Sequence, residues 1–138
     1  MHICEKIKDI AIQSGMWQAN FSNTEDLSFY PEIRKICEEN SCLNYGKTWA
    51  CPPAISTLDE CKKRVMQYKK MLLFSIKYDI ENSFDIQGMD NAQLSFKGSV
   101  DVFSEKNRAL QWDYLLLSNE GCGRCGKCTY PDASCRFP

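Results

Sequence analysis

Apolar residues recur every three or four positions near the start of the chain, at Ile3, Ile7, Ile10 and Ala11. This spacing predicts a helix over about residues 2–14, with one apolar face. Gly15 follows and is suited to the left-handed conformation that ends many helices.

The next part of the chain alternates turns with one short helix. Residues 20–28 are rich in turn formers, and Pro31 is suited to the first position of a helix that carries Ile33, Ile36 and Cys37. Residues 40–53 show no periodicity and are expected to form an irregular loop.

A third helix is indicated over about residues 57–68. Thr57 and Glu60 have the spacing of a capping box, and an apolar face follows at Leu58, Cys61, Val65 and Tyr68.

The only clear strand pattern lies at residues 70–80, where Leu72, Phe74 and Ile76 alternate with mixed residues. Residues 81–99 are polar and turn-prone, although Leu94 and Phe96 would suit a short second strand. Apolar positions then predict a helix over about residues 100–118, which Gly121 would end. We therefore expect an α+β or small α/β fold, with a central strand covered by the helices at 57–68 and 100–118.

Length and charge narrow the classes of protein. At 138 residues and 43% apolar composition, the chain is expected to form one domain over residues 1–138. A net charge of -1 lacks the positive field that attracts nucleic acid. No run of about 20 apolar residues and no secretory signal are evident, so we expect a cytoplasmic protein without a membrane anchor.

Nine cysteines stand out in a chain expected to remain in a reducing compartment. Thiols stay free there unless a metal or a catalytic role claims them, and an odd number leaves one unpaired in any disulfide framework. Cys4 lacks partner spacing and is interpreted as a passive thiol, and Cys61 falls on the apolar face of a predicted helix and is interpreted as a small buried residue.

The strongest motif is near the C-terminus, where Cys122, Cys125 and Cys128 are followed by Cys135. Three thiols at intervals of three, separated by glycines, can wrap one corner of a [4Fe-4S] cluster while the fourth reaches the remaining iron. Arg124, Lys127 and Arg136 either offset the negative charge of the thiolates or are only solvated loop residues. Zinc is the alternative, although structural zinc usually takes two separated cysteine pairs.

Cys37, Cys42 and Cys51 form a second, looser block. Proline directly after Cys51 is typical of ferredoxin ligands. Two interpretations are open for Tyr45, Trp49 and the prolines: residues of an ordinary core, which is the commoner case for such aromatics, or an apolar lid over a site. Three arrangements are open: a second cluster with one open iron, a second cluster with a fourth ligand from elsewhere, or a site shared with the C-terminal block.

The two blocks together resemble a family of predicted metal-binding proteins of unknown function. The resemblance rests on Cys37, Cys42, Tyr45-Gly46 and Trp49-Ala-Cys51-Pro-Pro, followed by the C-terminal run that ends in Cys135-Arg-Phe-Pro138. It implies that all seven cysteines of the two blocks serve metal binding. Members of that family usually continue past this point with a segment of small and polar residues.

The sequence reveals no reaction. The single histidine is His2, no phosphate-binding glycine loop is present, and neither block has the cysteine gaps of radical adenosylmethionine enzymes. We expect an iron–sulfur protein with one or two clusters that carries electrons to a partner protein or acts as an accessory module. A structural zinc protein, or an enzyme with an open iron at the N-terminal block, are the alternatives.

Overall fold

The computed structural model describes residues 2–118 and 122–137. The chain forms two compact units. Residues 2–24 and 69–116 make the first, here called the sheet unit; residues 25–68, 117–118 and 122–137 make the second, the cysteine unit. The expectation of one domain over residues 1–138 stays a prediction.

The sheet unit begins with α1 (Ile3–Gln13). The ring Nδ1 of His2 accepts a hydrogen bond from the backbone N–H of Cys4 at 3.3 Å, so the histidine caps the helix. Gly15 follows the helix with φ +103°, a conformation that side chains with a Cβ rarely adopt. The predicted helix and its glycine stop are confirmed.

A two-stranded antiparallel sheet follows, formed by β1 (Gln18–Asn23) and β2 (Lys70–Ser75). The register pairs Ala19 with Phe74 and Phe21 with Leu72. The predicted strand at 70–80 is therefore confirmed over 70–75. The turn assigned to residues 20–28 is wrong for its first part, because pairing with a distant strand makes residues 20–23 extended despite their polar side chains.

The longest helix of the described residues is α4 (Ile86–Arg108), which corrects three expectations. Residues 86–99 are helical rather than turn-like, and no strand forms at Leu94 and Phe96. The helix predicted at 100–118 starts earlier and ends ten residues sooner, so it does not lead directly into the C-terminal cysteines. Asp85 explains the start, because its carboxylate accepts the backbone N–H of Gly88 at 2.9 Å. The predicted stop at Gly121 lies outside the described residues.

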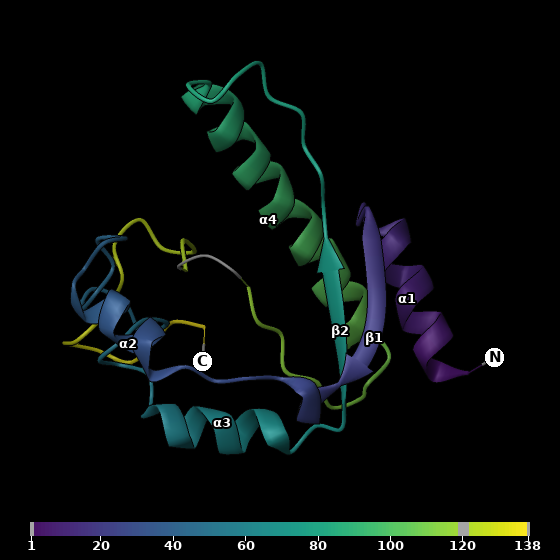
Figure 1. Ribbon diagram of the computed structural model, residues 1–138, viewed down its shortest axis with the longest axis horizontal. Coiled ribbons are helices and arrows are strands. Elements are labelled where there is room, and N and C mark those ends of the chain that lie inside the picture. The colour runs from purple at the N-terminus through teal and green to yellow at the C-terminus, as the bar shows by residue number, and fades with distance from the viewer. Residues whose placement is uncertain (1, 119–121, 138) are drawn as a thin grey trace. The chain divides into compact units, whose positions relative to one another are not determined.

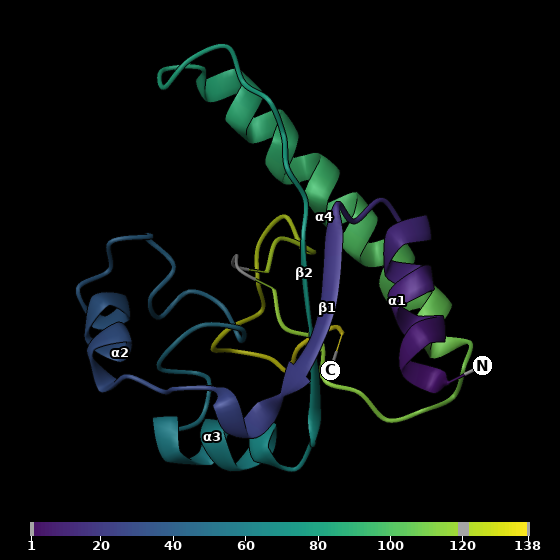
Figure 2. The same ribbon diagram turned by 45° about the vertical axis from the view of Figure 1, so that its right-hand side comes forward.

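The sheet unit has its core where α1 and α4 cover one face of the sheet (Figure 1). The rings of Phe74 and Phe103 lie 5.5 Å apart, and those of Phe74 and Phe96 lie 6.4 Å apart. The turned view shows the same layering, with the first half of α4 extending beyond the strands (Figure 2). The covering helices are thus α1 and α4; the helix predicted at 57–68 belongs to the cysteine unit. The fold class is a small α+β protein, as predicted.

The cysteine unit contains α2 (Pro31–Glu38) and α3 (Leu58–Met66), and the short 3₁₀ turn η1 (Thr24–Asp26) precedes them. Pro31 starts α2, as predicted. The capping box of α3 is complete: Thr57 Oγ1 accepts the N–H of Glu60, whose carboxylate accepts the N–H of Thr57. Between these helices, residues 40–53 form the irregular loop that the sequence predicts.

Within the described residues, none of the helices has the length and apolar character needed to cross a lipid bilayer.

Candidate metal centre

Every cysteine except Cys4 belongs to the cysteine unit. Both predicted ligand blocks are therefore held in one compact unit, and all of these thiols are free. Cys4 lies on α1 and belongs to the sheet unit.

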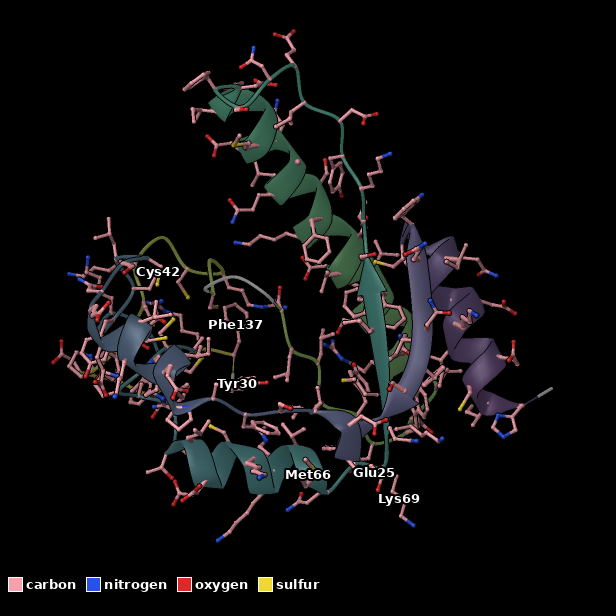
Figure 3. The ribbon with its side chains drawn as sticks, in the orientation of Figure 1. Glu25, Tyr30, Cys42, Met66, Lys69 and Phe137 are labelled. Atoms are coloured by element: carbon pink, nitrogen blue, oxygen red, sulfur yellow. The ribbon has the colours of Figure 1, made fainter. Side chains whose placement is uncertain are left out.

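The N-terminal block starts at the end of α2. Cys37 lies in the last turn of this helix and is half-buried, whereas Cys42 is exposed on the loop that follows, as Figure 3 shows. Asn40 and Leu43 have left-handed φ angles of 59° and 62°, which turn the chain sharply on either side of Cys42. The amide oxygen of Asn40 accepts the N–H of Tyr45 at 3.1 Å and stabilises this turn.

A second turn carries Cys51. Gly46, at φ 70°, donates its N–H to the carbonyl of Pro52 at 2.9 Å, which closes the loop around Trp49 and Cys51. The carbonyl of Cys51 then accepts the N–H of Ala54 at 3.0 Å. Cys51 is therefore held from both sides by backbone hydrogen bonds, and it is half-buried.

The C-terminal block is an irregular segment that folds back on itself. The N–H of Ala133 donates to the carbonyl of Thr129 at 3.1 Å, and the hydroxyl of Thr129 donates to the carbonyl of Ser134 at 3.0 Å. The guanidinium of Arg136 donates to the carbonyl of Lys127 at 3.1 Å. Arg136 follows Cys135 and Lys127 precedes Cys128, so this bond holds the end of the segment back against its start.

Trp49 joins the two blocks. Its indole N–H is directed at the carbonyl of Ala133, 3.0 Å away, and at the hydroxyl of Thr129, 3.3 Å away. Its ring meets that of Tyr130 edge-on, with centroids 4.9 Å apart. The N-terminal loop therefore contacts the residues that directly follow Cys128.

The thiol of Cys128 is set up to ionise. The backbone N–H groups of Tyr130 and Trp49 donate to its sulfur and lower its pKa, and the N–H of Thr129 and the charge of Arg136 act in the same direction. Partial burial opposes them without reversing the shift. Of the three cations that the sequence places among these cysteines, Arg136 has the predicted effect on a thiol. Arg124 lies over the ring of Phe137, 5.7 Å from its centroid.

The residues present suit a thiolate-ligated metal group. Thr48 Oγ1 is buried without a hydrogen-bond partner among the described residues, one residue from the Trp49 N–H that faces Cys128. A buried hydroxyl of this kind is suited to donate to the sulfur of a cluster. In the described part of the chain, no three histidine, cysteine, aspartate or glutamate side chains are grouped so that they could hold a metal ion.

Cys61 is half-buried on α3, where the sequence places it on the apolar face, and its Sγ lies 3.5 Å from the carbonyl of Ser56. Sequence reasoning did not single out Thr129 and Tyr130, although they directly follow Cys128. It gave Trp49 an apolar role, in the core or in a lid, whereas the indole N–H also forms a hydrogen bond to the C-terminal block. No local pattern encodes this hydrogen bond, since its partners are far apart in the sequence.

Comparison with protein-family models gives a match to "Predicted metal-binding protein (DUF2284)" over residues 21–138. The match covers both cysteine blocks and most of the chain. No curated protein and no solved structure matches the chain. Because the matched region covers most of the chain and includes every cysteine of the two blocks, the chain belongs to the DUF2284 family of predicted metal-binding proteins.

Proposed function

We propose that this protein binds iron–sulfur clusters of the [4Fe-4S] type and serves in the cytoplasm as an electron carrier, or as an accessory redox module for a partner protein. The ligands are drawn from the seven cysteines of the two blocks: Cys37, Cys42, Cys51, Cys122, Cys125, Cys128 and Cys135. The observation that carries the proposal is the gathering of both blocks in one unit, joined through Trp49.

The surroundings of Cys128 support thiolate ligation. Three backbone N–H groups and the charge of Arg136 favour the ionised thiol, which is the form that binds metal. The same donors would stabilise negative charge on the sulfur of a bound cluster and so raise the reduction potential of that cluster. A bound cluster would supply reversible one-electron transfer, and this chain's residues would hold it and set its potential.

Iron–sulfur is preferred to zinc because of the spacing of the C-terminal thiols. Cys122, Cys125 and Cys128 follow one another at intervals of three on a short loop with glycine between them. Such a loop places one thiolate on each of several irons, whereas a structural zinc ion usually takes pairs from two separate turns.

The test is to purify the protein without oxygen and measure iron, acid-labile sulfide and zinc per chain, together with the visible spectrum. We expect about four or about eight irons with equal sulfide. Cys125→Ala should lose about four irons, because it removes a ligand from the centre of the C-terminal run.

Cys4→Ala is the matched control, since it removes a half-buried thiol from the sheet unit and should leave the iron content unchanged. Stoichiometric zinc without sulfide would refute the iron–sulfur proposal and leave a zinc-stabilised structural domain. A reversible one-electron wave supports the electron carrier. A spectrum that changes with added cyanide or thiols would indicate an open iron instead, and with it an enzyme.

A further inference from the structure

The two cysteine blocks meet at one place in the cysteine unit. The indole of Trp49 bonds to residues on the far side of the loop that follows Cys128, and its ring packs against Tyr130. The backbone N–H of Trp49 also faces the sulfur of Cys128. Both the side chain and the backbone of Trp49 therefore lie against the Cys128 turn.

Cys51 is fixed close to this contact. Its N–H lies 3.4 Å from the carbonyl of Thr48, so residues 48–51 form a tight turn with Trp49 inside it. The ends of such a turn are less than about 7 Å apart. Because Trp49 contacts Thr129, Tyr130 and Ala133, the turn that carries Cys51 lies against the segment that follows Cys128.

The chemistry of cysteine runs points the same way. In two-cluster ferredoxins, the cysteine that precedes proline ligates the cluster of the other run, not of its own. Cys51 is the only cysteine of this chain that directly precedes a proline. The residue with the exchanged-ligand signature thus belongs to the turn whose Trp49 contacts the opposite block.

We propose that Cys51 and Cys128 ligate the same metal centre, so that a cluster takes thiolates from both blocks instead of from one. This inference rests on the proposed metal binding and deepens it by assigning ligands across the blocks. It replaces the simple division in which the C-terminal block holds one cluster and the N-terminal block holds another. Trp49 then acts as the residue that positions the two ligand segments.

The test compares iron per chain in Cys51→Ala, Cys128→Ala and the double variant. Ligands of one centre give equal losses that do not add, so the double variant should contain as much iron as either single variant. Separate centres give losses that add, and a double variant with the sum of both losses would overturn the proposal. Full iron in Cys51→Ala would overturn it as well.

An alanine variant can lose all metal because the unit fails to fold. In that case Cys51→Ser and Cys128→Ser test whether the two residues share a centre, since serine oxygen can keep a weakened cluster in place. The proposal expects both changes to alter the same paramagnetic signal of the reduced protein, and changes in two different signals would refute it. If the wild-type protein contains zinc, the iron–sulfur proposal fails but the shared-centre proposal does not. The same variants, measured as zinc per chain, then still test the shared centre.

Discussion

Trp49→Phe removes the indole N–H that joins the two cysteine blocks while it keeps an aromatic ring. That N–H is shared between Ala133, at 3.0 Å, and Thr129, at 3.3 Å, so it counts as about one hydrogen bond with a net contribution of about 1 kcal/mol. The edge-on contact with Tyr130 is worth about 1 kcal/mol more. We expect Trp49→Phe to reduce the free energy of opening of the C-terminal loop by about 1 kcal/mol, and Trp49→Leu by about 2 kcal/mol.

Hydrogen–deuterium exchange of metal-free protein measures this local free energy, because it reports the opening of individual segments. Exchange in residues 129–135 should become about 5-fold faster in Trp49→Phe and about 30-fold faster in Trp49→Leu. Far-UV circular dichroism should stay unchanged, since neither substitution touches a helix or strand.

Trp17→Phe is the control. Trp17 belongs to the sheet unit, is 57% exposed and has Lys77 Nζ over its ring at 5.8 Å, so its loss should leave exchange in residues 129–135 unchanged. If Trp49→Phe also changes this exchange by less than twofold, the indole does not hold the two blocks together and the reasoning is refuted.

Leu43→Gly should raise the free energy of unfolding by up to about 1 kcal/mol, because Leu43 is 66% exposed and has a left-handed φ of 62° that glycine adopts without strain; a lower melting temperature would contradict this. Gly15→Ala should lower the unfolding free energy by about 1–2 kcal/mol, since φ is +103° there. Gly98→Ala, inside α4 where an added Cβ meets nothing, should raise it by up to about 1 kcal/mol in the same thermal denaturation series. In metal-free protein the folded-state pKa of Cys128 lies below its unfolded value, so the thiolate adds stability above the unfolded pKa and this is lost as the pH falls through the folded-state pKa. Alkylation of Cys128 followed by mass spectrometry should therefore titrate at lower pH than in guanidinium-unfolded chain, and Arg136→Gln should move the midpoint upward; an unmoved midpoint would exclude a role for this charge.

Local signals predicted those elements whose ends are fixed by neighbouring residues. Gly15 ends α1, Pro31 starts α2, and the Thr57–Glu60 capping box starts α3, so each boundary is readable within a few positions. These features act through the backbone of adjacent residues and need no tertiary contact.

The errors fell where tertiary packing outweighs local preference. β1 has the polar sequence Gln-Ala-Asn-Phe-Ser-Asn, and it is extended because β2, far along the chain, supplies its hydrogen bonds. In α4, the interior Gly98 costs about 1 kcal/mol relative to alanine, and it and Gly88 in the first turn hide the helical period. Burial of Val100 and Phe103 in the core offsets this cost.

Cysteine spacing marked the residues of the candidate metal centre, and the family match supports metal binding. The spacing left three arrangements open for the N-terminal block. What the sequence could not supply is the contact of Trp49 with Thr129 and Ala133, because side chains separated by about 80 positions meet only in the fold.

The hydrogen bond from Thr24 N–H to Lys69 carbonyl, 3.1 Å long, has a consequence for how the chain folds. It joins the two ends of residues 25–68, so β1 and β2 are the stem of a long excursion that carries Cys37, Cys42 and Cys51. Closing an unstructured loop of that length costs about 3 kcal/mol of chain entropy. A metal bound by two of these three cysteines would shorten the unstructured loop. Part of the entropy cost of closing the loop would then be removed before β1 and β2 pair. Metal occupancy would thereby strengthen a sheet that provides none of the ligands.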